Sequence, residues 1–194
     1  MLKPIFFIFS KVFNRLEVIG SENVPKEGGV IIAANHLSYL DPPIIGLALK
    51  RPPTFIAKEG LFRTPLFGKF IRFFSFPVNR DRPQPSAIKE AVSRLREGKI
   101  VVVFPEGGRS ADGSLLDAKR GVGMIAAISV APVVPTLIEG TDSALPAGAK
   151  FLRPAKIRVI FGNPLKIEKK ERDKHFHERM SREIMERIRS LKCQ

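Results

Sequence analysis

Residues 29–43 read GVIIAANHLSYLDPP. The first six of them form an unbroken apolar run rich in β-branched side chains, which predicts a buried core strand. Asp41 is a residue type favoured at helix N-caps, and the two prolines that follow suit a first helical turn, where no backbone N–H is missed. We therefore expect a strand over 29–34 and a helix over 42–49, with Asp41 as its N-cap.

The turn between these two elements carries a histidine and a carboxylate at a useful spacing. His36 lies at the end of the predicted strand, and Asp41 at the start of the predicted helix. A carboxylate that accepts from one ring nitrogen fixes the imidazole tautomer and leaves the other nitrogen as a proton acceptor. A single His-x4-Asp pattern also fits a surface histidine beside a helix cap, so a second signal is needed.

The second signal is the stretch IVVVFPEGGRS over residues 100–110. Its first five residues are apolar and predict the central strand of a sheet, buried on both faces. Gly107 and Gly108 would let backbone amides approach an anion, and Arg109 can hold a phosphate through two hydrogen bonds. Glu106 has two interpretations, in which it holds either Arg109 or a substrate hydroxyl.

Asn-His-x4-Asp, followed about 65 residues later by Phe-Pro-Glu-Gly-x-Arg-Ser, resembles the glycerolipid acyltransferases, most nearly their PlsC-like 1-acylglycerol-3-phosphate branch. The resemblance covers about Asn35 to Pro135. It implies a single α/β domain with a mixed, mostly parallel sheet flanked by helices, as in the glycerol-3-phosphate acyltransferases. It also implies transfer of a fatty acyl group from a thioester to lysophosphatidic acid, giving phosphatidic acid, with His36 as general base and Asp41 as its orienting partner.

The resemblance implies further site residues. Those that would hold the acceptor phosphate are Lys58, Arg80, Glu106, Gly107, Gly108 and Arg109. Pro132 and Pro135 would shape the acyl pocket, and Lys119 with Gly121 match a less specific feature of the family. One departure concerns acceptor specificity, because the family usually has threonine where this chain has Gly108.

Several alternatives stay open at this stage. The acceptor could be glycerol 3-phosphate, another lysophospholipid or a lyso-aminolipid, and a non-catalytic basic membrane-surface protein is a rival from another class. The donor could be acyl-CoA or acyl carrier protein. The chain has no Gly-x-Ser-x-Gly elbow, and its only cysteine, Cys193, lies in a polar tail, so direct attack without an acyl-enzyme is expected. No metal or other cofactor is implied.

Charge is the outlier in the composition. The 194 residues carry a net charge of +14, whereas the 44% hydrophobic content is ordinary for a folded protein. Between residues 50 and 82, eight basic side chains face two acidic ones. Such a field favours polyanions, namely nucleic acid, an anionic membrane or an acidic carrier protein. The absence of zinc-finger spacing and of an RNA-binding aromatic signature argues against nucleic acid.

The N-terminal segment 1–15 is amphipathic, and residues 16–194 are expected to form the acyltransferase domain. The unbroken apolar run Ile5–Phe9 is far shorter than the roughly 20 residues that a membrane-spanning helix needs. The segment could pack on the domain or lie in the membrane interface, and we expect an interfacial anchor because the presumed substrate is a lipid. A single cysteine fits a reducing compartment, so a peripheral location on the cytoplasmic face is expected.

The remaining pattern alternates strands and helices, which is typical of an α/β domain. The expected strands are 16–19, 54–57, 130–138 and 155–161, and the expected helices are 84–97, 122–129 and an amphipathic C-terminal helix over 171–191. Residues 60–74 are expected to form a short helix or amphipathic loop, and residues 76–80 to end in a basic turn. His175 and His177 are expected to be solvated residues of the C-terminal helix.

Overall fold

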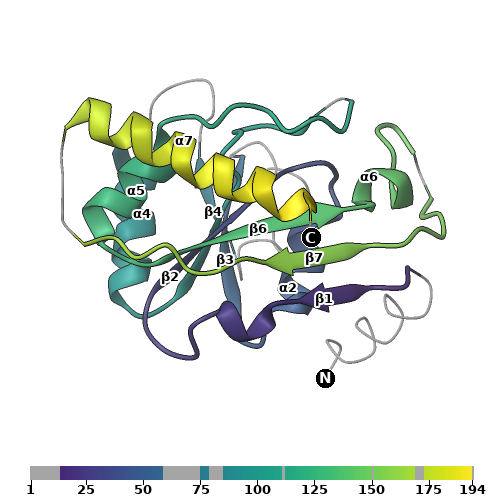
Figure 1. Ribbon diagram of the computed structural model, residues 1–194, viewed down its shortest axis with the longest axis horizontal. Helices are drawn as coiled ribbons and strands as arrows, with labels where there is room; N and C mark the ends of the chain where they lie inside the picture. The colour runs from purple at the N-terminus through teal and green to yellow at the C-terminus, as the bar shows by residue number, and fades with distance from the viewer. Residues whose placement is uncertain are drawn as a thin grey trace.

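The computed structural model describes residues 14–58, 75–78, 85–110, 112–149, 151–168 and 173–193. Its strands form one seven-stranded sheet in the order β1-β7-β6-β2-β5-β3-β4 (Figure 1). The strands are β1 (Glu17–Ile19), β2 (Val30–Ala34), β3 (Pro53–Lys58), β4 (Ser75–Val78), β5 (Ile100–Val103), β6 (Val133–Glu139) and β7 (Arg158–Phe161). Among these described strands, only the β6–β7 pair is antiparallel. The predicted mixed, mostly parallel sheet is confirmed.

Helices cover both faces of the sheet and make three layers (Figure 1). Helix α2 (Asp41–Ala48) packs on one face. Helices α4 (Pro85–Arg96), α5 (Gly121–Ser129) and α7 (Lys174–Ser190) pack on the other. Two 3-10 turns, η1 (Ser21–Asn23) and η3 (Leu191–Cys193), and the short helix α6 (Thr141–Ala144) complete the assigned elements.

Strand β2 lies in the middle of the sheet and is fully buried. Successive strand residues face opposite sides, so Ile31 and Ala33 meet α4, α5 and α7, whereas Val30, Ile32 and Ala34 meet α2. Both faces lie against helices, which explains why the run is apolar throughout. β5 is equally buried but is the neighbour of β2, so the expectation that β5 is the central strand was wrong.

Two local expectations need correction at the ends of elements. The N-cap of α2 is Leu40, and Asp41 is the first helical residue, with its carboxylate turned back toward the preceding loop. Val130 ends α5 in the left-handed conformation, so β6 begins at Val133 rather than at residue 130. Residues 76–80 were expected to end in a basic turn, and the first three of them belong to strand β4, which pairs with β3.

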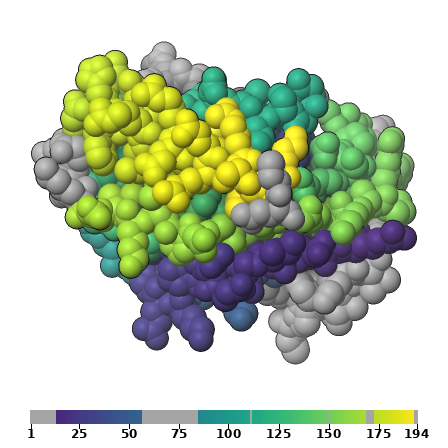
Figure 2. Space-filling model, in the orientation of Figure 1, coloured from purple at the N-terminus to yellow at the C-terminus, as the bar shows by residue number. Residues whose placement is uncertain are grey.

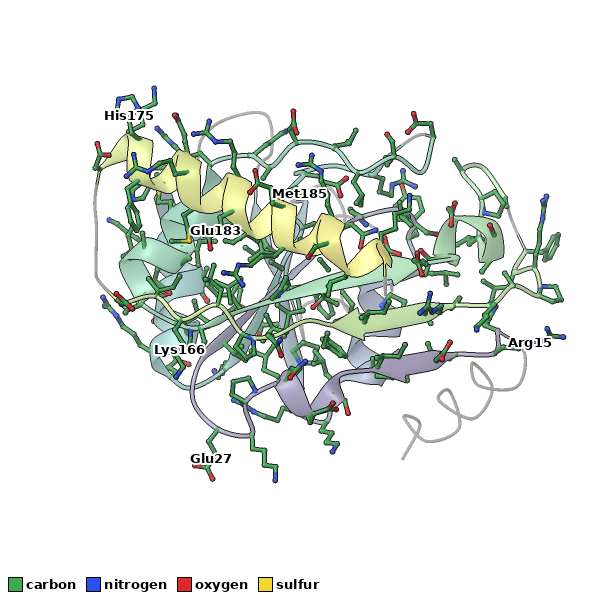
Figure 3. All side chains as sticks on the ribbon, viewed as in Figure 1. Arg15, Glu27, Lys166, His175, Glu183 and Met185 are labelled. Atoms are coloured by element: carbon green, nitrogen blue, oxygen red, sulfur yellow. The ribbon has the colours of Figure 1, made fainter. Side chains whose placement is uncertain are left out.

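His177 is buried, with 4% of its surface exposed, so the prediction that it is solvated was wrong. The cause is the close approach of α7 to α5 at Gly123, whose amide donates to Ser181 Oγ at 3.0 Å. A Cβ on Gly123 would lie 2.1 Å from the His177 carbonyl oxygen, so only glycine permits this packing. His175, two residues earlier, is exposed as expected (Figure 3).

The parallel strands β2, β5, β6 and β3 all end at one edge of the sheet, and the antiparallel β7 begins there. β1 runs parallel to β7, so it begins at that edge too. None of the helices in the described ranges is long and apolar enough to cross a membrane. The predicted N-terminal anchor up to residue 13 and the element predicted over 60–74 lie outside the described residues.

Candidate active site

The first polar residue after β2 extends the sheet with its side chain. Asn35 is buried, and its Nδ2 donates to the Ile138 carbonyl at 2.9 Å while its Oδ1 accepts from the Ile138 amide at 2.7 Å. The side chain therefore replaces the backbone ladder to β6 where β2 ends. This bridge fixes the position from which the next residue, His36, leaves the strand.

His36 and Asp41 meet as their spacing predicts. Nδ1 of His36 lies 2.7 Å from Oδ2 of Asp41. A carboxylate oxygen can only accept, so Nδ1 carries the hydrogen and Nε2 is left as the proton acceptor. The imidazole also stacks on the Phe104 ring, with centroids 4.1 Å apart and an angle of 18° between the planes. Both contacts restrict the ring, and only 7% of His36 is exposed.

Asp41 is fully buried, and both of its oxygens are hydrogen-bonded. Oδ2 also accepts from the Leu37 and Ser38 amides at 2.7 and 2.8 Å. Oδ1 accepts from the hydroxyl of Thr141 at 2.5 Å, across 100 residues of sequence. Four donors thus compensate the burial of one carboxylate.

Thr141 is a site residue that the sequence analysis missed. It is fully buried at the start of α6, directly after Gly140 and the end of β6. The signal that could have found it is positional, because polar residues that directly follow parallel strands gather at the same sheet edge. His36 follows β2 in the same way.

Glu106, in the loop after β5, is a second buried carboxyl group beside His36. Its Oε1 accepts from the His36 amide over a long 3.4 Å, and within the described residues its buried Oε2 has no hydrogen-bond partner. Burial raises the pKa of Glu106 from 4.5 to about 7. The amides of His36 and Leu116 offset part of that rise in pKa, and the nearby Asp41 charge adds to it. The Ser110 amide donates to the His36 carbonyl at 2.9 Å and ties the two loops together.

The glycine pair in this loop has one constrained member and one open member. Gly107 has a φ of +69°, and a Cβ there would lie 2.7 Å from Cδ of Lys119. The Lys119 amide also donates to the Pro105 carbonyl at 2.8 Å, so this lysine, matched only to a less specific family feature, lies directly across the glycine turn. A Cβ added to Gly108 would meet no atom of the described residues within 4 Å, so this part of the chain leaves the position open.

Arg109 is exposed and lies over the Tyr39 ring, with Cζ 3.7 Å from the ring centroid. Within the described residues no contact joins it to Glu106. The guanidinium is therefore held beside the loop that carries His36 by a cation–π contact, and no described residue accepts a hydrogen bond from it.

The other predicted site residues are placed differently. Lys58 is the last residue of β3 and so lies at the same sheet edge, whereas Arg80 lies outside the described residues. Pro132 precedes β6 and accepts from the Ile31 amide at the opposite edge, and Pro135 is buried within the strand opposite Ala33. The structure does not bring these two prolines to His36, and their predicted role in the acyl pocket stays a prediction.

The described residues include no group of three His, Cys, Asp or Glu side chains that could hold a metal ion. The expectation that the reaction needs no cofactor stays a prediction. The fold and site together define a three-layer α/β protein with a buried imidazole–carboxylate pair and a cation-bearing glycine turn at one sheet edge.

Comparison with known proteins shows which family this is. The family model described as Acyltransferase matches residues 15–139. A 1-acyl-sn-glycerol-3-phosphate acyltransferase of Bacillus subtilis is 35% identical over 77% of this chain and 73% of its own length. A chloroplastic protein of the same description from Arabidopsis thaliana is 33% identical over 79% of this chain. The matched region covers 44% of that longer relative.

A solved structure agrees with the sequence comparisons. The crystal structure of the 1-acyl-sn-glycerophosphate (LPA) acyltransferase PlsC from Thermotoga maritima superposes with a TM-score of 0.74 at 29% identity, covering 99% of this chain and 82% of that one. The chain therefore belongs to the acyltransferase family, in its PlsC-like branch. The family and the O-acyltransferase class predicted from the sequence are confirmed.

Proposed function

We propose that this protein transfers a fatty acyl group from a thioester to the free hydroxyl of lysophosphatidic acid, giving phosphatidic acid for phospholipid synthesis. The observation that carries the proposal is the buried His36–Asp41 pair with its 2.7 Å hydrogen bond, in a chain whose relatives carry this activity in their names. The Arg109 guanidinium beside the same loop supports an anionic acceptor.

In the proposed step, Nε2 of His36 takes the proton of the acceptor hydroxyl as its oxygen attacks the thioester carbonyl carbon. Asp41 keeps the imidazole oriented and stabilises the imidazolium that forms. The tetrahedral intermediate then collapses, the carbon–sulfur bond breaks, and the proton on His36 passes to the leaving thiolate. The products are an ester and a free thiol, so the atoms balance without an acyl-enzyme.

The proposed phosphate site lies at the glycine turn. Arg109 and the backbone amides of Gly107 and Gly108 would hold the acceptor phosphate, with Lys119 beside them across Gly107. Lys58 and Arg80 are proposed to complete the cationic pocket, as the resemblance to the family implies. Glu106 is proposed to accept from an acceptor hydroxyl, because its buried Oε2 has no partner within the described residues.

A second acceptor is kept in view because of one residue. Gly108 lacks the threonine hydroxyl that the family usually offers, so glycerol 3-phosphate, another lysophospholipid or a lyso-aminolipid is the alternative acceptor. The donor of the proposal is a thioester of either CoA or acyl carrier protein. The reaction is proposed to occur at the cytoplasmic face of the membrane, where a peripheral enzyme meets a lipid acceptor.

Free-thiol release tests the proposal. Palmitoyl-CoA and an acylated carrier protein are each supplied with and without oleoyl-lysophosphatidic acid, and the lipid product is identified by mass. We expect release that depends on the lysolipid, and a loss of about 10²–10⁴-fold in His36→Ala, the usual effect of removing a general base. The matched control is His175→Ala, which removes an exposed histidine at the start of α7.

The other outcomes discriminate the rivals. Thiol release without an acceptor would indicate a thioesterase. Release that appears only with glycerol 3-phosphate or a lyso-aminolipid would change the acceptor and keep the mechanism. Vesicle binding with no turnover on any acceptor would favour a non-catalytic membrane-surface protein.

A further inference from the structure

The loop between α6 and β7 exposes apolar side chains to water. Phe151 is 81% exposed, the highest value for any large hydrophobic side chain in the described part of the chain, and Leu152 beside it is 41% exposed. Neither residue belongs to either of the two core clusters. Folding of the described residues therefore leaves this pair largely in contact with water.

The surroundings of this pair are cationic. Arg153 follows Leu152 and is exposed, and Arg15 is exposed next to Asn14, whose Nδ2 donates to the Arg153 carbonyl at 3.3 Å. Figure 2 shows the two segments in contact at the right edge of the molecule, purple against green, and Figure 3 labels Arg15 there. Within the described residues neither arginine forms an ion pair, whereas Lys156 nearby is paired with Glu17 at 3.0 Å.

The loop lies at the sheet edge that carries the candidate active site. β6 ends at this edge and leads into α6, and the antiparallel β7 begins there, so residues 145–157 join the two at the edge (Figure 1). Hydrogen bonds connect the loop to the site. Ser38, whose amide donates to Asp41, also donates from Oγ to the Leu145 carbonyl at 3.0 Å, and the Arg153 amide donates to the Ala144 carbonyl at 2.8 Å.

We propose that the loop from Phe151 to Arg153 is a membrane contact that inserts Phe151 and Leu152 into the interface of an anionic bilayer, with Arg153 and Arg15 at the headgroups. An aromatic and an aliphatic side chain flanked by cations suit the boundary between headgroups and acyl chains. A stable protein partner would need a much larger interface, about 800 Å² on each side. The loop then brings the bilayer to the edge at which His36 lies, and this purpose rests on the proposed lipid acceptor.

The absence of tryptophan from the sequence gives a direct test. In the full chain, Phe151→Trp places a single indole fluorophore at the loop. We expect its emission to shift to the blue on phosphatidylglycerol-containing vesicles, less on pure phosphatidylcholine, and to be quenched by lipids with brominated acyl chains. The matched control is Ile19→Trp. Ile19 is 37% exposed and lies at the end of β1 that is away from the active site, so the emission of this indole should not shift.

A binding measurement completes the test. The double variant Phe151→Ser with Leu152→Ser should weaken sedimentation with anionic vesicles about tenfold or more, the loss expected when a buried aromatic side chain is removed. Ile19→Ser should bind as the wild type does. On a short-chain, water-soluble lysophosphatidate without vesicles, the double variant should turn over at the wild-type rate, since neither residue lies in the site.

Three results would overturn the membrane contact. The first is an indole emission of the Phe151→Trp variant that does not change on vesicles to which the protein binds. The second is equal vesicle affinity of the double variant and the wild type, and the third is no vesicle binding at all. A blue shift on raising the protein concentration without vesicles would assign the loop to a second copy of the chain instead. Insertion of the introduced indole in a protein without acceptor-dependent thiol release would support the loop and reject the proposed function, so the two failures are distinguishable.

Discussion

The loops after β2 and β5 each bury a carboxyl group beside His36, and the two carboxyl groups differ in how fully they are hydrogen-bonded. Asp41 is fully buried and accepts four hydrogen bonds, three of them 2.7–2.8 Å long at the oxygen that faces His36. Glu106 is 3% exposed, and its pKa is raised to about 7. Its Oε1 accepts from the His36 amide over 3.4 Å, and within the described residues its Oε2 has no hydrogen-bond partner. The oxygens of Asp41 are therefore satisfied without a ligand, whereas the buried Oε2 of Glu106 can still accept a hydrogen bond from one. The difference suits an orienting role for Asp41 and a ligand-facing role for Glu106.

The largest expected effect comes from removing the negative charge of Asp41, whose two oxygens are both hydrogen-bonded. In Asp41→Asn, the amide oxygen can still accept from His36 Nδ1, while the charge that would stabilise the imidazolium is lost. We expect kcat to fall about 10²–10⁴-fold with a smaller loss of stability, about 1–3 kcal/mol. Turnover and thermal unfolding measured on the same sample check this. A variant that keeps wild-type kcat would show that Asp41 serves the fold alone.

The corresponding neutral substitution in the second loop, Glu106→Gln, should act mainly on the pH dependence of stability. The folded state raises the pKa of this carboxyl group above its unfolded value, so between pH 4.5 and about 7 the folded state binds more protons and wild-type stability falls as pH rises. Glutamine removes that loss, so above pH 7 the variant should be more stable by up to about 3 kcal/mol. Urea unfolding from pH 4 to pH 8 measures it.

The control for Glu106→Gln is Glu97→Gln on the surface. A hydrogen bond from Lys99 and its charge lower the pKa of Glu97, so this carboxylate contributes stability above its unfolded pKa that is lost as the pH falls. The control variant should therefore be slightly less stable than the wild type at neutral pH, the opposite sign. Equal pH profiles for wild type and Glu106→Gln would mean that Glu106 is ionised in the folded protein as readily as in water.

Thr141→Val tests whether the hydrogen bond from Thr141 to Oδ1 of Asp41 matters for turnover. Thr141→Val removes the donor to Asp41 Oδ1, and we expect kcat/KM to fall about tenfold, because hydrogen bonds to charged groups contribute about 1.5–3 kcal/mol. Thr141→Ser should restore most of it. The loss should appear in kcat, with the KM of the acceptor nearly unchanged, because Thr141 acts through Asp41 on the orientation of His36.

Thr136→Val is the matched control, since Thr136 is equally buried but donates to the Val134 carbonyl at 3.3 Å. It should change stability and leave kcat in place. A kcat that does not fall in Thr141→Val either would reduce Thr141 to a structural residue.

The smallest effects separate the two glycines of the second loop. Gly107→Ala should cost about 1–2 kcal/mol of stability, because a left-handed φ of +69° disfavours a Cβ that would also meet Lys119. Gly108→Ala should stay within about 0.5 kcal/mol, because no described residue lies within 4 Å of the added Cβ. Thermal unfolding compares them. Gly108→Thr should then change the KM of the acceptor by a few-fold without loss of stability, and an unchanged KM would place Gly108 away from the acceptor.

Local pattern was enough to predict much of the fold and the centre of the site. The apolar runs that became β2 and β5 are buried on both faces, and such burial is visible in composition alone. His36 and Asp41 are five residues apart across one turn, so their contact needed no knowledge of the rest of the chain. The glycine turn and Arg109 likewise follow directly from the strand that precedes them.

Contacts between distant segments could be decided only by the tertiary structure. Thr141 reaches Asp41 because the order of strands brings the loops after β2 and β6 to one edge. Lys119 crosses Gly107 because the connection between β5 and α5 folds back on itself. His177 is buried because α7 meets α5 at a glycine, which its own polar sequence does not reveal. Periodicity records which faces of an element are buried, whereas strand order and helix docking depend on the whole chain, and these placed Thr141 beside Asp41 and Glu106 beside His36.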